Sequence, residues 1–153
     1  MIQRIQTLYL IVAVALTGIL FFFDIALLTG NEGIFSFRYN GFFVFGSTET
    51  EIIVRLIPLS ILVYLSVFSI FSSIFLFKKR ILQIRLCGLN MGLLLGITGM
   101  AIYSGFDAAK GWDMKISYNF VIILPVIAII FIFLAMRAIM KDEVLVKSLD
   151  RIR

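Results

Sequence analysis

The chain has 153 residues, a net charge of +5 and 61% hydrophobic residues, well above the roughly 45–50% of soluble domains, so its composition excludes an ordinary soluble protein. The chain contains no histidine and a single cysteine, Cys87, so it lacks the usual ligand sets for zinc, haem and iron–sulfur clusters. It also cannot form a Ser–His or Cys–His nucleophile pair or an internal disulfide. We therefore expect no cofactor, no metal site and no enzymatic activity.

Apolar stretches without a charged residue run through the chain at residues 5–23, 56–77, 86–106 and 116–136. A helix needs about 20 apolar residues to cross the hydrocarbon core of a bilayer, and it satisfies its own backbone polar groups there. We therefore predict an all-α membrane protein with a single domain, 1–153. Its four-transmembrane-helix bundle is predicted to span residues near 5–28, 56–77, 86–106 and 116–138. The first stretch is too long for a secretory signal and lacks a following A-x-A-like cleavage site, so we expect it to be retained.

Asp24 is the one carboxylate embedded in an apolar run, between Phe23 and Ile25. An ionisable group inside a membrane is a functional suspect by default. Asp24 lies at the far end of the first span, however, which favours a position at the outer membrane–water interface. We expect an interface ion pair between Asp24 and Arg55, and a proton-carrying site is the alternative.

The loop between the first two spans carries a β-hairpin signal in FSFRYNGFFVF, residues 35–45. Large side chains alternate with others before Asn40 and Gly41, which are the residue types preferred in a type I′ turn. We predict an outer-face hairpin at residues 34–45 that lies over the end of the bundle. Its phenylalanines are expected to contact lipid or a partner protein: Phe35, Phe37, Phe43 and Phe45.

The second outer loop alternates apolar and polar residues from Trp112 to Tyr118. This period of two is typical of a strand, which would extend the hairpin to a three-stranded sheet. The alternative is that Trp112 and Tyr118 are aromatic residues of the membrane interface and form no strand.

Serines line one helical face of the second span at Ser66, Ser69 and Ser73. Each hydroxyl can bond a carbonyl one turn earlier, so helix packing is favoured over a polar conduit. Asn90 is the most polar residue well inside the third span, and we expect its amide to join two helices, with the serine face as one source of a partner. Contact with a ligand is the alternative.

The third span also carries glycines at a spacing of three to four residues, namely Gly88, Gly92, Gly96 and Gly99. Small residues at this spacing let two helix backbones approach closely. We predict that these glycines pack against another helix of the same chain. A homodimer interface is the alternative.

The fourth span contains Pro125, which we expect to kink the helix. The chain then ends in KDEVLVKSLDRIR, residues 141–153, where apolar residues recur at helical spacing. We predict a cytoplasmic amphipathic helix at residues 139–153. Its basic residues are expected to contact anionic lipid or a partner protein: Lys141, Lys147, Arg151 and Arg153.

Basic residues outside the spans gather on one side. They precede the first span, follow the fourth and fill KKRILQIR, residues 78–85, whereas the other side carries Arg38, Arg55, Lys110 and Lys115. The positive-inside rule then places both termini in the cytoplasm. The net positive charge follows from this topology, so we do not expect nucleic-acid binding.

The opening MIQRIQTLYL, the ending KDEVLVKSLDRIR and the spacing of the spans resemble a family of small four-span integral membrane proteins of Bacteroidota, classed as a domain of unknown function. The resemblance covers essentially the whole chain. It implies a location in the bacterial cytoplasmic (inner) membrane. The family brings no assigned catalytic residues, so none is transferred to this sequence.

These features favour a non-enzymatic accessory or scaffold subunit of a bacterial inner-membrane protein complex. The apolar hairpin, the glycines and the basic tail offer contact surfaces for the lipid bilayer and for other inner-membrane proteins, and a homo-oligomer is left open. The alternative is a small transporter, channel or lipid-binding module, which Asp24, Asn90 and the serine face would serve. An intramembrane enzyme is disfavoured because no spacing unites the acids of the outer loops.

Overall fold

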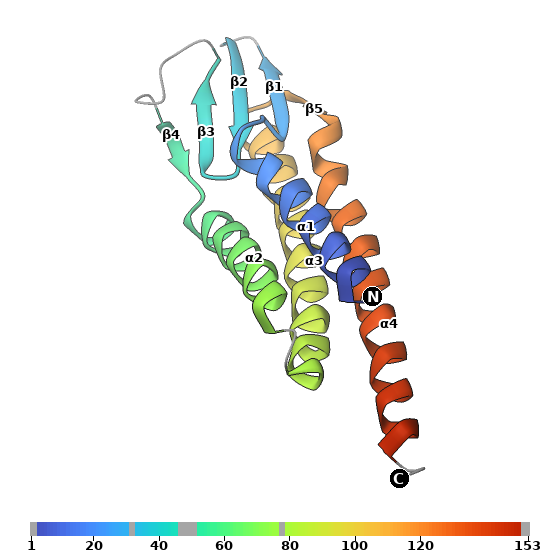
Figure 1. Cartoon of the computed structure of the whole chain (residues 1–153). Helices are drawn as coiled ribbons and strands as arrows, with labels where there is room; N and C mark the ends of the chain where they lie inside the picture. Colours follow the sequence, from blue (N-terminus) through green and yellow to red (C-terminus); the bar gives the residue numbers. More distant parts are fainter. Residues whose placement is uncertain (1–2, 31–32, 46–51, 77–78, 151–153) are drawn as a thin grey trace.

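The computed structural model describes residues 3–30, 33–45, 52–76 and 79–150. In this part of the chain four helices run side by side, and a sheet lies at one end of them (Figure 1). The helices are α1 (Gln3–Gly18), α2 (Ile57–Phe75), α3 (Arg80–Gly111) and α4 (Leu124–Asp150). A short 3₁₀ helix, η1 (Ile19–Phe21), follows α1, and another, η3 (Phe120–Ile123), precedes α4. The prediction of a mainly helical protein is confirmed.

Among the described residues, three helical segments are long and apolar enough to cross a membrane, namely Ile57–Phe75, Arg80–Gly111 and Phe120–Val144. The apolar segment Ile5–Phe21 is shorter. Helix α1 packs mainly against α2 and α4, and α3 packs against the same two helices. The side chains between the helices form an apolar core that includes Leu10, Ala13, Val63, Ile70, Leu94 and Ile132.

In the described part of the chain the sheet has five antiparallel strands, in the order β4-β3-β2-β1-β5. Its strands are β1 (Ala26–Gly30), β2 (Gly33–Arg38), β3 (Gly41–Val44), β4 (Ile52–Arg55) and β5 (Lys115–Tyr118). Trp112 follows directly after α3, and its ring centroid lies 5.9 Å from that of Phe35 and 5.3 Å from that of Phe42. This tryptophan therefore attaches the hairpin to the end of α3.

The hairpin predicted at residues 34–45 is confirmed as β2 and β3, but the predicted turn is wrong. Arg38 pairs with Gly41, so the two loop residues are Tyr39 and Asn40. Gly41 is instead the first residue of β3 and has a φ of 154°. A Cβ at this position would collide with the carbonyl oxygen of Val54 in β4. Glycine is therefore required here by its backbone conformation and by the neighbouring strand.

The first predicted span, 5–28, is wrong at its C-terminal end. Helix α1 stops at Gly18, η1 follows, and Ala26 to Leu28 belong to β1. Strand β1 lies between β2 and β5, which satisfy its backbone, and Ala26 and Leu28 point into the core. A buried strand is as apolar as a membrane helix, so hydropathy does not separate the two.

The predicted third strand exists as β5, but its partner differs from the prediction. It pairs with β1, with Ala26 opposite Tyr118, and not with the hairpin. Because β5 and η3 occupy residues 115–123, α4 begins only at Leu124. Pro125 therefore lies in the first turn of α4, where a proline is tolerated, and the predicted kink deep in the helix is wrong. The helix then continues without a break to Asp150, through the described part of the predicted tail helix.

Candidate functional site

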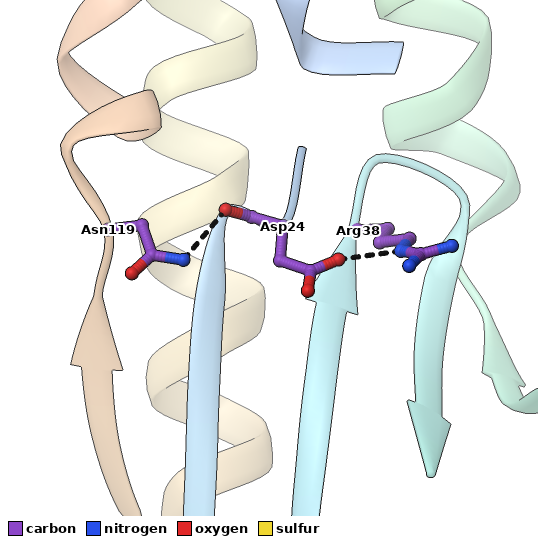
Figure 2. Close-up of polar contacts among 3 residues, drawn as sticks. All are labelled: Asp24, Arg38 and Asn119. Atoms are coloured by element: carbon purple, nitrogen blue, oxygen red, sulfur yellow. Dashed lines mark hydrogen bonds and ion pairs between the residues drawn. The ribbon is translucent and has the colours of Figure 1, made fainter. Parts of the chain in front are cut away.

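The junction between sheet and helices is held by Asp24, Arg38 and Asn119 (Figure 2). Asp24 lies just before β1, and its Oδ1 accepts a hydrogen bond of 2.6 Å from Nε of Arg38 at the end of β2. Asn119, just after β5, donates from Nδ2 to the backbone oxygen of Asp24 at 3.0 Å. The arrangement ties three chain segments together. A carboxylate engaged in this way acts as a structural clamp, which argues against the proton-carrying alternative.

The predicted ion pair between Asp24 and Arg55 is wrong. In the sheet order β4-β3-β2-β1, Arg55 at the end of β4 is separated from β1 by two strands. Arg38 lies on the strand next to β1 and reaches Asp24, and its guanidinium carbon also lies 5.5 Å from the ring centroid of Phe43. Arg55 is exposed.

An aromatic cluster fixes the hairpin loop to the ends of two helices. The ring centroid of Phe21 in η1 lies 5.0 Å from that of Tyr39 and 5.1 Å from that of Tyr64 in α2. The hydroxyl groups of the two tyrosines are 3.3 Å apart, and Ser60 donates to the backbone oxygen of Tyr39 at 3.2 Å. These contacts stabilise the loop between β2 and β3.

A tyrosine at the end of β5 joins this strand to α3. The Tyr118 hydroxyl donates to the backbone oxygen of Ile102 at 3.0 Å. Burial raises the pKa of Tyr118, which favours the neutral hydroxyl that this hydrogen bond requires. Tyr118 therefore has a structural role in addition to its place in the sheet.

The hairpin phenylalanines do not form the common contact surface that the sequence predicts. Phe37 and Phe43 are buried, and the ring centroid of Phe37 lies 4.6 Å from that of Phe42. The prediction that these two side chains contact lipid or a partner is therefore wrong. Phe35 is half-buried against Trp112, and Phe45 alone of the four is exposed, at 55%. Packing against neighbouring side chains, in the apolar core for Phe37 and beside Arg38 for Phe43, buries rings that an isolated hairpin would expose.

The hydroxyl groups of Ser66 and Ser73 form hydrogen bonds with backbone oxygens of their own helix, α2. Ser66 donates to the backbone oxygen of Val63, and Ser73 donates to that of Ser69, each at 2.9 Å. All three serines are buried, as expected for helix packing. These hydrogen bonds stay within one helix, so they leave no hydroxyl of Ser66 or Ser73 to line a conduit.

Gln83 forms an interhelical hydrogen bond that sequence reasoning missed. Its Nε2 donates to the backbone oxygen of Ser73 at 3.0 Å, and its side chain is buried. Ser73 lies within the last turn of α2, where carbonyl groups lack a partner in their own helix. Gln83 of α3 therefore caps α2. In the sequence Gln83 lies in the basic segment KKRILQIR, residues 78–85, which is predicted to be a loop, so no interhelical contact is expected there.

Asn90 does not bond to the serine face, so that prediction is wrong. It is fully buried in α3, yet neither Oδ1 nor Nδ2 of its amide forms a hydrogen bond with the described residues. A buried amide without partners destabilises the fold, by about 1–3 kcal/mol for each unsatisfied group.

The glycines of α3 form an exposed strip, which we call the glycine face and define as Gly88, Gly92, Gly96 and Gly99. A Cβ added at any of them would meet no atom within 4 Å. The prediction that they pack against another helix of the same chain is therefore wrong. Asn90, Leu94 and Ile97 on the opposite side of α3 are buried instead.

At the other end of the helices, far from the sheet, some charged residues form ion pairs and others are exposed. Arg80 of α3 lies 3.2 Å from Asp142 and 3.9 Å from Glu143 of α4, measured between guanidinium nitrogens and carboxylate oxygens. Lys141, on the same turn of α4, is exposed. Of the other predicted tail contacts, the Lys147 side chain, Arg151 and Arg153 lie outside the described residues.

Among the described residues, no three His, Cys, Asp or Glu side chains lie close enough to hold a metal ion. The family model described as "Domain of unknown function (DUF4293)" matches residues 2–152 of the chain. A comparison with curated proteins finds no match.

Proposed function

The chain belongs to the DUF4293 family, and from this premise and its geometry we propose that it is a non-enzymatic accessory or scaffold subunit of a protein complex in the bacterial inner membrane. In this proposal all four helices cross the membrane and both termini lie in the cytoplasm. The glycine face of α3 is the surface on which a helix of another subunit, or of a second copy, packs.

The charge distribution supports the proposed orientation. The start of α3 and the second half of α4 lie at the end of the helices that is remote from the sheet (Figure 1). By the bounds of these helices, this end carries the basic residues Lys79, Arg80, Arg85, Arg137 and Lys141. Cytoplasmic ends of membrane helices carry an excess of basic residues. The sheet then faces the periplasm, where its short strands cap the helices.

The glycine face is the observation that carries the proposed contact. A glycine inside a helix costs roughly 0.5–1 kcal/mol relative to alanine. A row of four on an exposed side therefore lowers helix stability and gains no packing within the chain. In lipid, helices associate through close packing at such rows of small residues. A second helix lying on this face would offset the cost of the glycines.

The test is a pair of small-to-large substitutions on the glycine face, Gly92→Leu with Gly96→Leu. The tagged full chain is crosslinked in its native membrane, extracted in mild detergent and sized, and its partners are identified by mass spectrometry. Wild type should migrate as a stoichiometric complex, and the double variant as the single chain. Differently tagged copies distinguish a second copy from another subunit.

The matched control is Ala15→Leu, which enlarges an exposed small residue on α1. It should leave the complex unchanged, because Ala15 lies outside the glycine face. A wild-type chain that elutes alone after crosslinking contradicts the proposal, and so does a double variant that keeps the complex.

The alternative function, a small transporter, channel or lipid-binding module, has support only in its lipid-binding form. Asp24 is engaged by Arg38, and Ser66 and Ser73 bond within α2, which argues against a polar path through the helices. A groove between α1 and α4, in contrast, combines apolar walls with two cations.

A further inference from the structure

A groove of about 950 Å³ opens between the beginning of α1 and the second half of α4. Its walls include Ile5 and Tyr9 from α1 and Leu134, Arg137 and Lys141 from α4. Figure 1 shows that α4 runs on past the beginning of α1, and the residues that line the groove come from these parts of the two helices. The ring of Tyr9 packs on Phe131 with centroids 6.3 Å apart, which fixes one wall in place.

Two cations line this groove without a counter-charge from the described residues. Arg137 and Lys141 stand one turn apart on α4 and form no hydrogen bond or ion pair within that part of the chain. The acids that follow them, Asp142 and Glu143, lie instead beside Arg80 of α3. Like charges four residues apart repel each other on a helix. The groove therefore favours an anion between its two cations.

The position of the cations matches the surface of a bilayer. The rise is about 2.0 Å per residue in η3 and 1.5 Å per residue in α4, so Arg137 and Lys141 lie about 27 and 33 Å along the helix from Phe120, where the apolar segment begins. The hydrocarbon core is about 30 Å thick, so the two cations reach the level of the lipid headgroups. Leu134, one turn closer to the middle of the bilayer, is exposed together with Ile5.

We propose that this groove binds one anionic phospholipid of the cytoplasmic leaflet. The phosphate lies between the guanidinium group of Arg137 and the ammonium group of Lys141, and an acyl chain lies along Ile5, Tyr9 and Leu134. Arginine pairs with phosphate through two parallel hydrogen bonds, and lysine adds a point charge. The inference rests on the proposed membrane location and orientation, but not on the proposed partner at the glycine face.

The test uses the purified full chain in detergent, incubated with mixed micelles that contain equal amounts of phosphatidylglycerol and phosphatidylcholine. Lipid retained on the protein is measured by native mass spectrometry. Wild type should retain phosphatidylglycerol in preference to phosphatidylcholine by about tenfold, since each cation near a membrane surface contributes attraction to anionic lipid. The variant Arg137→Gln with Lys141→Gln should lose this preference.

Two further variants separate a bound lipid from diffuse attraction. Lys79→Gln with Arg85→Gln also removes two positive charges, from exposed residues at the start of α3 and outside the groove. This variant should keep the preference for phosphatidylglycerol. Leu134→Trp fills the groove without a change of charge, and should reduce retention of both lipids. Equal retention of the two lipids by wild type overturns the proposal, as does a charge control that loses as much as the groove variant.

Failure of this proposal is distinguishable from failure of the proposed function. The glycine-face variant, Gly92→Leu with Gly96→Leu, should retain phosphatidylglycerol as wild type does, because its substitutions lie on α3 and outside the groove. A chain that stays in solution without detergent would contradict both proposals, since both require insertion in a membrane.

Discussion

Arg38 donates a hydrogen bond of 2.6 Å to Asp24, and thereby joins the end of β2 to the residue that leads into β1. The side chains are 34% and 23% exposed, so solvent weakens their attraction without removing it. Asn119, which follows β5, donates a hydrogen bond to the backbone oxygen of the same aspartate. Asp24 therefore connects β1 with both β2 and β5.

The first prediction concerns this ion pair. We expect Asp24→Asn and Arg38→Gln each to lower thermal stability in detergent, and a double-mutant cycle to give a coupling of about 0.5–1 kcal/mol. Arg55→Gln serves as the control and should be neutral, because Arg55 is exposed on a distant strand. Additive effects of the two substitutions would show that the pair contributes nothing.

The second prediction concerns Gly41. We expect Gly41→Ala to destabilise the protein by more than about 1 kcal/mol, because alanine would take a positive φ and collide with the Val54 carbonyl oxygen. Gly33 also has a positive φ, 133°, but faces open space. Gly33→Ala therefore measures the cost of the backbone conformation alone. Thermal unfolding should show the larger loss at Gly41, and equal losses would exclude the collision.

The third prediction compares two buried amides of α3. Asn90→Leu should raise stability by about 1 kcal/mol, since it removes an amide that forms no hydrogen bond with the described residues. Gln83→Leu should lower stability by about 0.6 kcal/mol, since it removes the cap on the Ser73 carbonyl. Unfolding curves in detergent give both values. A loss of stability in Asn90→Leu would show that this amide has a partner in the membrane.

The fourth prediction concerns the attachment of the sheet to the helices. Trp112→Ala should destabilise the protein by about 2–3 kcal/mol, because the indole contacts both Phe35 and Phe42. The loss should appear first as faster proteolysis within the hairpin of β2 and β3, which carries both phenylalanines. Trp112→Phe keeps an aromatic ring at this site and should restore most of the protection. Unchanged proteolysis in Trp112→Ala would show that the sheet is held by other contacts.

The sequence predicts the helices and the hairpin well, because their signals are local. Runs of apolar residues mark α2, α3 and α4, and the alternation around Asn40 marks β2 and β3. The same hydropathy misassigns β1, because a strand buried in the core is as apolar as the helix that precedes it. A local pattern thus identifies an element without identifying its partner.

Residue contacts within the site are harder to predict, because they depend on the order of the strands and on the rotation of the helices. Asp24 pairs with Arg38 since β2, and not β4, adjoins β1. In α3 both sides of the helix are apolar, as expected for a membrane helix, so the spacing of the glycines does not reveal which side is buried. Only the fold shows that Asn90 faces inward and Gly92 outward.

Because β1 pairs with β5, the sheet can be completed only late in the synthesis of the chain. A ribosome makes β1 before any of the three long helices, and β5 only after α3 is finished. During that interval one edge of β1 lacks its partner strand, in which Tyr118 lies opposite Ala26. An unpaired strand edge can form hydrogen bonds with strands of other chains. Nascent chains truncated after α3 should therefore be the aggregation-prone species, and synthesis as far as Tyr118 closes the edge.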